Sequence, residues 1–211
     1  MPSDGPAGSV LILAVVRVTY ATPPTPPGVS AGRGGVDPDV RVDTPELRAA
    51  KDRIGMLDCE PGAGEPVQGG LPEVTLPCLG GGPDVELSTL RGPAVINLWQ
   101  ARCEPCREEM PALEEFHQRY GDQVAVIGID FNDVQPAAAL ALAEETGVTY
   151  PSIADPGGDL MTQEAFAIAR RGLPAFLFVD ADGTVAGQSS GGVDSVAEVR
   201  ELVAEHLGVT L

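Results

Sequence analysis

Two cysteines, Cys103 and Cys106, are separated by two residues and carry the clearest chemical signal in this 211-residue chain. The apolar segment 94–98 comes just before them and predicts a strand, while an amphipathic helical pattern follows them. This order places Cys103 at the N-terminus of a helix and Cys106 one turn inside it. Such a pair can hold an accessible disulfide and exchange it with another thiol. The sequence therefore predicts a redox-active dithiol.

Cys103 is the expected nucleophile of the pair, because the positive end of the helix dipole favours a thiolate over a thiol. Pro105 has no N–H, which leaves the amide of Cys106 as the main donor to that thiolate. Arg102 and Arg107 add positive charge on either side, while Glu104 opposes them. Together these features are expected to lower the pKa of Cys103 below the value of about 8.5 of a free thiol. Cys106 is the expected resolving thiol, which attacks the mixed disulfide and releases the partner.

A carboxylate follows the pair at a helical spacing. Glu109 lies three residues after Cys106 and hence on the same helix face. If it is half-buried, its pKa is raised and it can accept the proton of the resolving thiol. The alternative is an ordinary acidic residue in the first turn, favoured there by the helix dipole. Asn97, on the strand that approaches the site, is expected to fill a polar hydrogen-bonding position.

A second element of the site is predicted about seventy residues downstream, where Leu173-Pro174 opens another strand. An X–Pro bond at such a place can be cis. A cis bond would turn the backbone of Leu173 toward solvent, where its N–H and C=O can pair with an incoming peptide as an added strand does. The alternative is an ordinary proline of an edge strand.

The remaining cysteines, Cys59 and Cys78, bring the total to an even number. They predict a second, structural disulfide, which requires an oxidising compartment. The alternative is a small core residue and an idle thiol. A zinc site is disfavoured because its ribbon pattern needs two close cysteine pairs. His117 and His206 are expected to be surface or packing residues, and no metal or organic cofactor is expected because the sulfurs carry the electrons themselves.

Composition limits the partners and the location. The formal charge of −18 comes from 13 basic and 31 acidic residues, so such a surface repels nucleic acid. The apolar run 10–16 is shorter than the ~20 residues that span a bilayer, but it suits the core of a signal peptide. It is preceded by Asp4 and by no Lys or Arg. Residues 1–20 are therefore interpreted as a signal peptide or the remnant of an anchor.

The rest of the chain divides into two parts. Residues 21–68 are rich in Pro and Gly and predict a linker, extended or disordered over residues 21–43 and with a short helix near 45–54. Residues 69–209 alternate strand and helix patterns and end in a hairpin and a capped helix. This order predicts one α/β domain, with a central mixed sheet flanked by helices.

Several short motifs follow one another in a fixed order: Asn97-Leu-Trp99, Cys103-Glu-Pro-Cys106-Arg-Glu-Glu109-Met-Pro111, Gly128-Ile-Asp130, Tyr150-Pro151, Gly172-Leu-Pro174 and Asp180-Ala-Asp-Gly183. In order and spacing they resemble the TlpA/ResA branch of the thioredoxin-like superfamily, a group of exported thiol–disulfide oxidoreductases. The resemblance covers about residues 69–208, and residues 71–81 look like actinobacterial members, in which an upstream cysteine similar to Cys59 is common. Residues 132–156 resemble the helix and loop that this branch inserts into the thioredoxin core.

The resemblance implies a thioredoxin-like fold, a location in the cell envelope, a cis Pro174 and an acid role for Glu109. Substrate contacts are expected from Trp99, Arg102 and Leu173. One departure concerns Arg102, since relatives usually carry an aromatic residue immediately before the first cysteine, where it shields the disulfide and shapes docking.

The sequence thus predicts a monomeric, extracytoplasmic thiol–disulfide oxidoreductase that reduces or exchanges disulfides in exported proteins. Its partners would be protein thiols or disulfides and a redox partner protein, with a membrane tether at the N-terminus. One alternative is a peroxiredoxin-like peroxide reductase, although Gln100 stands where such enzymes place a threonine. The other is a non-catalytic thioredoxin-fold binding module, in which Cys103 and Cys106 form a static disulfide.

Overall fold

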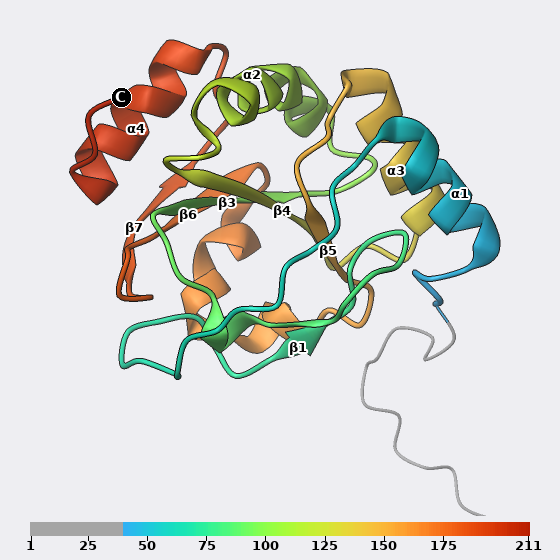
Figure 1. The fold of residues 1–211 in the computed structure, drawn as a ribbon, viewed down its shortest axis with the longest axis horizontal. Helices are drawn as coiled ribbons and strands as arrows, with labels where there is room; N and C mark the ends of the chain where they lie inside the picture. The colour runs from blue at the N-terminus through green and yellow to red at the C-terminus, as the bar shows by residue number, and fades with distance from the viewer. Residues whose placement is uncertain (1–39) are drawn as a thin grey trace, which may run out of the picture. The chain divides into compact units, whose positions relative to one another are not determined.

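A computed structural model describes residues 40–211. The segment predicted at 1–20 and the first half of the linker predicted at 21–68 lie outside this range. The described part is built around a five-stranded sheet of order β5-β4-β3-β6-β7, with helices against both faces (Figure 1). Its strands are β3 (Ala94–Trp99), β4 (Ala125–Phe131), β5 (Ser152–Asp155), β6 (Ala175–Val179) and β7 (Val185–Ser190).

The sheet is mixed, as the sequence predicts. β4 runs parallel to both β3 and β5, whereas β6 runs antiparallel to β3 and β7 antiparallel to β6. Every residue of β3 is buried, because this central strand is covered on both faces. Its side chains alternate between two cores: Val95 and Trp99 belong to one, and Ile96 and Leu98 to the other.

Three long helices cover one face of the sheet. They are α2 (Glu104–Tyr120), α3 (Pro136–Thr146) and α4 (Val196–Leu207), and they lie above the sheet in Figure 1. Met110, Leu113 and Phe116 of α2 are fully buried, which matches the predicted apolar spacing. α2 contains Pro111 and continues through it as one helix. Packing of this face against the sheet therefore holds α2 in place.

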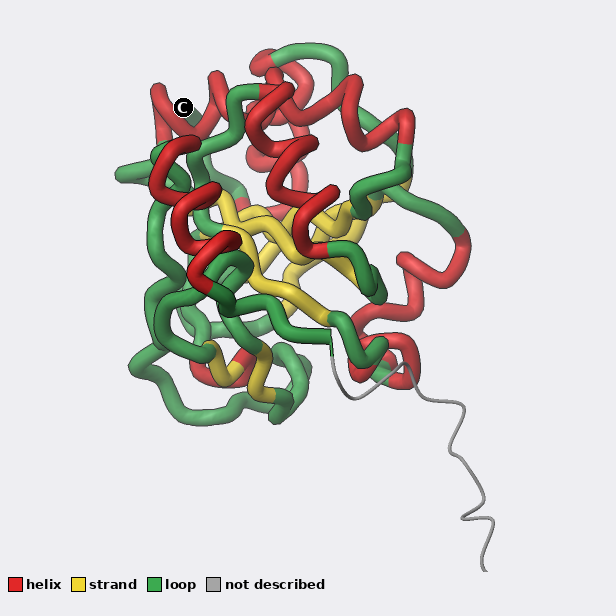
Figure 2. The backbone as a smooth tube through the Cα atoms, turned by 90° about the vertical axis from the view of Figure 1, so that its right-hand side faces the viewer, coloured by secondary structure: helices red, strands yellow, loops and turns green. Residues whose placement is uncertain are grey.

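The other face is covered by short elements. These are the β1–β2 hairpin and three 3₁₀ helices, which Figure 2 shows on the far side of the sheet from the long helices. Their bounds are β1 (Thr75–Leu76), β2 (Val85–Glu86), η1 (Leu87–Thr89), η2 (Asp159–Thr162) and η3 (Glu164–Arg171). η3 ends immediately before Gly172, and residues 172–174 connect it to β6.

The helix α1 (Pro45–Ile54) forms at its predicted position, and the Thr44 hydroxyl accepts a hydrogen bond from the N–H of Leu47 at 3.3 Å. The linker interpretation is wrong for this part of the chain. Leu47 and Met56 are buried in the same core as the long helices, and α1 packs against α3. A few separated apolar side chains, among them Leu47 and Met56, thus pack this Pro- and Gly-rich segment against the domain.

Met56 and its neighbour Leu57 test this docking as a matched pair. Met56 is 6% exposed and Leu57 is 51% exposed. Met56→Ala should cost about 2–5 kcal/mol of unfolding free energy, because it leaves a cavity in the core. Leu57→Ala should change it by less than about 0.5 kcal/mol. Urea unfolding measures both, and equal midpoints for the two variants would contradict the docking.

Candidate active site

The two cysteines lie at the N-terminal end of α2, shortly after the end of β3. Cys103 is the N-cap of α2, and its Sγ accepts a hydrogen bond from the N–H of Cys106 at 3.2 Å. The two residues form a disulfide with their Cα atoms 5.2 Å apart. Cys103 is half-buried and Cys106 is fully buried. An attacking group can therefore reach Cys103 more readily than Cys106, which suits the predicted division into nucleophile and resolving thiol.

The two arginines beside the pair have different surroundings. Arg102 is exposed at the mouth of α2. Arg107 forms ion pairs with Glu104, at 3.4 Å, and with Glu145. Glu104 opposes the charge of Arg107, as expected, and Glu145 is a second carboxylate that offsets it. The stabilisation of a Cys103 thiolate is left mainly to the helix N-terminus and the Cys106 N–H.

Glu109 is the buried carboxyl group of the site, with 1% of its surface exposed. Burial raises its pKa from 4.5 to about 8, while hydrogen bonds from Asn97 and the Val193 backbone oppose the rise. Asn97, on β3, donates from Nδ2 to Glu109 Oε1 at 2.6 Å. The expected polar position of Asn97 is therefore a contact with Glu109 itself. A carboxyl group with this pKa can take up or release a proton near neutral pH.

The loop between β7 and α4 also contacts Pro174 and the core around Cys106, and no sequence motif predicted this contact. The peptide bond between Leu173 and Pro174 is cis. The carbonyl of Pro174 accepts a hydrogen bond from the N–H of Gly191 at 3.1 Å. Val193, two residues later, is buried in the core that contains Cys106. This loop therefore joins Pro174 to the surroundings of Glu109.

A surface cavity of about 510 Å³ lies beside the disulfide. Cys103, Arg102 and Leu173 all line it, so three of the predicted site residues meet at one surface. Trp99 does not, because its side chain is 0% exposed and packs in the core. The expectation that Trp99 contacts substrate is corrected by this burial. Its place on β3 makes it a packing residue beneath the site.

Two buried aspartates, Asp130 and Asp133, lie close to the strand and loop that lead to Cys103, and no sequence motif marked them as site residues. Asp133 accepts a hydrogen bond from the N–H of Ala101 at 2.8 Å, and so holds the loop that leads to Cys103. Asp130 is 0% exposed and lies opposite Trp99 in the β3–β4 register. Burial, and then the charges of Asp133 and Asp155, raise the pKa of Asp130 well above its ordinary value.

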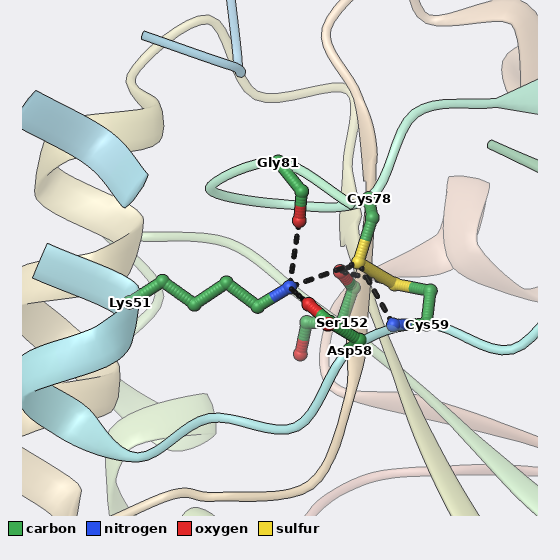
Figure 3. Close-up of a disulfide and its surroundings, with 6 residues drawn as sticks. All are labelled: Lys51, Asp58, Cys59, Cys78, Gly81 and Ser152. Atoms are coloured by element: carbon green, nitrogen blue, oxygen red, sulfur yellow. Dashed lines mark hydrogen bonds and ion pairs between the residues drawn. A yellow bond between two sulfur atoms is a disulfide. The ribbon is translucent and has the colours of Figure 1, made fainter. Parts of the chain in front are cut away.

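The structure also joins Cys59 to Cys78, the pairing expected from the sequence, with their Cα atoms 5.7 Å apart. Cys78 forms a backbone bridge with Ile153 of the edge strand β5, and Figure 3 shows this second disulfide beside Ser152 of the same strand. Within residues 40–211, no group of three or more His, Cys, Asp or Glu side chains is arranged to hold a metal ion.

A mixed sheet flanked by helices, with a disulfide at the N-terminus of the first long helix and a cis-proline immediately before β6, defines a thioredoxin-like fold. Residues 67–188 match the model of the AhpC/TSA family. The chain belongs to this family.

Named relatives agree with the TlpA/ResA-type resemblance. The thiol:disulfide interchange protein DsbE of Pseudomonas fluorescens is 31% identical over 64% of this chain and 73% of its own length. The thioredoxin-like protein YneN of Bacillus subtilis is 32% identical over 36% of this chain, and the match spans only 52% of YneN. Bacillus proteins named thiol-disulfide oxidoreductase ResA also match.

Among solved structures, a putative protein disulfide isomerase from Bacteroides thetaiotaomicron superposes with a TM-score of 0.53 at 28% identity. It covers 71% of this chain and 96% of its own.

The pKa of Glu109 predicts how stability changes with pH. Because the pKa rises from 4.5 to about 8 on folding, the contribution of this group is complete below pH 4.5 and is lost as the pH rises through 8. Glu109→Gln should remove this fall, which amounts to about 1 kcal/mol per pH unit. Urea unfolding of the oxidised protein between pH 5 and pH 8.5 measures it.

The matched control is Glu108→Gln, an exposed neighbour on the same helix. It should keep the pH dependence of the unmodified protein. A Glu109→Gln variant whose stability falls with pH as steeply as that of the control would show that Glu109 is ionised at neutral pH in the fold.

Proposed function

We propose that this protein is a thiol–disulfide oxidoreductase that reduces or exchanges disulfides in other proteins through Cys103 and Cys106. The observation that carries this proposal is the hydrogen bond from the Cys106 N–H to Cys103 Sγ at the N-terminus of α2. This contact and the helix dipole stabilise negative charge on the more exposed sulfur. The named relatives support the same activity.

The reaction begins with the reduced protein. The Cys103 thiolate attacks one sulfur of a substrate disulfide and forms a mixed disulfide, while the other substrate sulfur leaves as a thiolate. Cys106 then loses its proton, and its thiolate attacks Cys103 Sγ. The Cys103–Cys106 disulfide forms, the bond between Cys103 and the substrate breaks, and the second substrate sulfur leaves as a thiolate. One proton originating from Cys106 and one from solvent convert the two substrate thiolates into a dithiol. Two electrons thus pass from the protein to the substrate.

Glu109 is the acceptor of the Cys106 proton in this scheme. It lies one helical turn from Cys106, and its pKa of about 8 lies close to that of a free thiol. At neutral pH part of the Glu109 population is ionised and can take the proton. Asn97 keeps the carboxyl group oriented through its 2.6 Å hydrogen bond. Asn97 is therefore a positioning residue.

The substrate is proposed to bind as an extended segment across the cavity beside Cys103. Leu173 and Arg102 line this cavity, and the half-buried Leu173 immediately precedes the buried Pro174. A peptide that pairs with the backbone of Leu173 would place its disulfide next to Cys103, as an added strand does at a sheet edge. Arg102 supplies charge where relatives have an aromatic side chain, so docking here has a polar component.

The proposed location is outside the cytoplasmic membrane, with a protein thiol as redox partner and one chain as the working unit. Two disulfides within residues 40–211 suit an oxidising compartment. The apolar segment 10–16 would serve as a signal peptide or part of a tether. In the described part of the chain, no helix has the length and apolar character needed to cross a bilayer.

The peroxiredoxin alternative is weaker on the geometry around Cys103. Gln100 occupies the position three residues before it, where that chemistry uses a threonine hydroxyl. The Gln100 side-chain amide donates to the carbonyl of Phe131 at 2.8 Å and to that of Asn132 at 3.2 Å. Its N–H groups are thus engaged with the backbone, which disfavours a role in positioning a peroxide.

Two serine variants test the exchange reaction. Cys103→Ser should abolish reduction of insulin disulfides by the protein with dithiothreitol as electron source. Cys106→Ser should instead accumulate a mixed disulfide with insulin, because Cys103 still attacks but no resolving thiol releases the product. Turnover rates measure the first effect, and non-reducing mass spectrometry detects the second.

The two variants control for each other, since each removes one sulfur from the same helical turn. Equal insulin reduction by the unmodified protein and by Cys103→Ser would contradict the proposed exchange reaction at Cys103. A mixed disulfide that accumulates at Cys106 of the Cys103→Ser variant, and not at Cys103 of the Cys106→Ser variant, would reverse the assigned roles.

A further inference from the structure

The second disulfide has a charged environment that a purely structural cross-link does not need. Lys51 of α1 is 4% exposed, and its Nζ lies 3.4 Å from Cys78 Sγ. The same ammonium donates to Asp58 Oδ1 and to the carbonyl of Gly81, both at 2.7 Å. Figure 3 shows the extended Lys51 side chain ending at this sulfur. A buried ammonium is costly unless it is paired, so its position beside a sulfur calls for an explanation.

The two sulfurs of this disulfide differ in their polar neighbours. Cys78 Sγ faces two donors, the Lys51 ammonium and the N–H of Cys59 at 3.1 Å. The carbonyl of Ser152, an acceptor, lies closer to Cys59 Sγ, at 3.2 Å, than to Cys78 Sγ, at 3.7 Å. After reduction, a thiolate at Cys78 would keep both donors, and a protonated thiol at Cys59 could donate to the carbonyl. The surroundings therefore already suit one particular reduced form.

Access to the bond is asymmetric in the same sense. Both cysteines are buried, with 3% of Cys59 and 1% of Cys78 exposed, but a cavity of about 630 Å³ is lined by Cys59 and not by Cys78 or Lys51. Thiol attack on a disulfide displaces the sulfur on the far side of the attacked atom. A nucleophile in this cavity would therefore meet Cys59 and displace Cys78 toward Lys51. Figure 3 shows Lys51 reaching the pair from the Cys78 side.

We propose that Cys59–Cys78 is a second exchangeable disulfide, reduced by a dithiol that attacks Cys59 from this cavity, with Cys78 leaving as a thiolate stabilised by Lys51. The site is separate from the Cys103–Cys106 centre, and its chemistry does not depend on the function assigned to that centre.

The electron balance is that of one two-electron exchange. A donor thiolate forms a bond to Cys59 Sγ, the Cys59–Cys78 bond breaks, and its electron pair goes to Cys78. The second donor thiolate then attacks the donor sulfur of the mixed disulfide and releases Cys59. The donor becomes a disulfide, one of its protons ends on Cys59, and the other passes to solvent while Cys78 stays ionised beside Lys51.

The test uses the full chain with both active-site cysteines replaced, Cys103→Ser/Cys106→Ser, so that only this disulfide can react. Reduced dithiothreitol is the probe, and samples are quenched with acid, alkylated and analysed by mass spectrometry. The disulfide of the folded protein should be reduced at a rate that low urea concentrations do not change. Resistance until the protein unfolds would overturn the proposal.

Two substitutions near the site are expected to act in opposite directions. Lys51→Met in this background should slow reduction and shift its equilibrium toward the disulfide, each by about tenfold, because the leaving thiolate loses its ammonium. Asp58→Asn should speed reduction about threefold, because it removes a competing carboxylate from Lys51. Arg53→Met is the matched control on α1, since Arg53 pairs with Glu144 on the surface, and it should change neither quantity.

The direction of the Lys51 effect separates this proposal from a structural role. If Lys51 only holds the surrounding loops together, Lys51→Met loosens them and the disulfide is reduced faster. An equal or faster rate in Lys51→Met therefore overturns the proposal. If that variant does not fold, Asp58→Asn decides alone, because the Asp58 side chain is 74% exposed and its replacement leaves the core intact. An unchanged or slower rate in Asp58→Asn would then be the contradicting result.

Discussion

One hydrogen bond organises the chemistry of this protein: the N–H of Cys106 donates to Cys103 Sγ at the first turn of α2. The contact exists only if a helix starts immediately after Cys103, where Pro105 stands in the first turn, and burial of the apolar face of α2 holds that helix in place. Met110, Leu113 and Phe116 hold this face against the sheet. Asp133 holds the preceding loop through the N–H of Ala101. Reactivity at one sulfur thus depends on packing several turns away.

The same core contains a polar pair that apolar packing alone would disfavour. Glu109 and Asn97 are buried together, and desolvation keeps the carboxyl group protonated over a much wider pH range than in water. The Asn97 amide satisfies one carboxyl oxygen. A neutral Glu109 costs far less to bury than a carboxylate, yet with a pKa of about 8 it still exchanges its proton. The burial that stabilises the neutral form also creates the acid–base group.

Residues with a strong local pattern were predictable from the sequence. The apolar run 94–99 and the spacing after Cys103 locate β3 and α2, and Thr44, Gly147 and Ser195 mark helix ends that the structure keeps. The dithiol and the strand opened by Pro174 follow from these elements.

Features that depend on tertiary contacts were not predictable. The four-residue strand β5 is too short to show a period, and it forms by pairing with β4. Residues 40–68 read as a linker because their docking uses isolated side chains such as Met56. Trp99 belongs to one of the motifs of the site, but its side chain is buried in the core and does not line the cavity. The contact between Lys51 and Cys78 joins residues 27 positions apart, and no local pattern encodes it.

The central claim, that the N-terminus of α2 makes Cys103 an ionised nucleophile, is tested most directly by the pH dependence of its alkylation. Iodoacetamide would be added to the reduced Cys106→Ser variant over a range of pH, and labelling of Cys103 followed by mass spectrometry. The account predicts a half-maximal rate at a pH clearly below the value of about 8.5 of a free thiol. A midpoint at or above that value would contradict it.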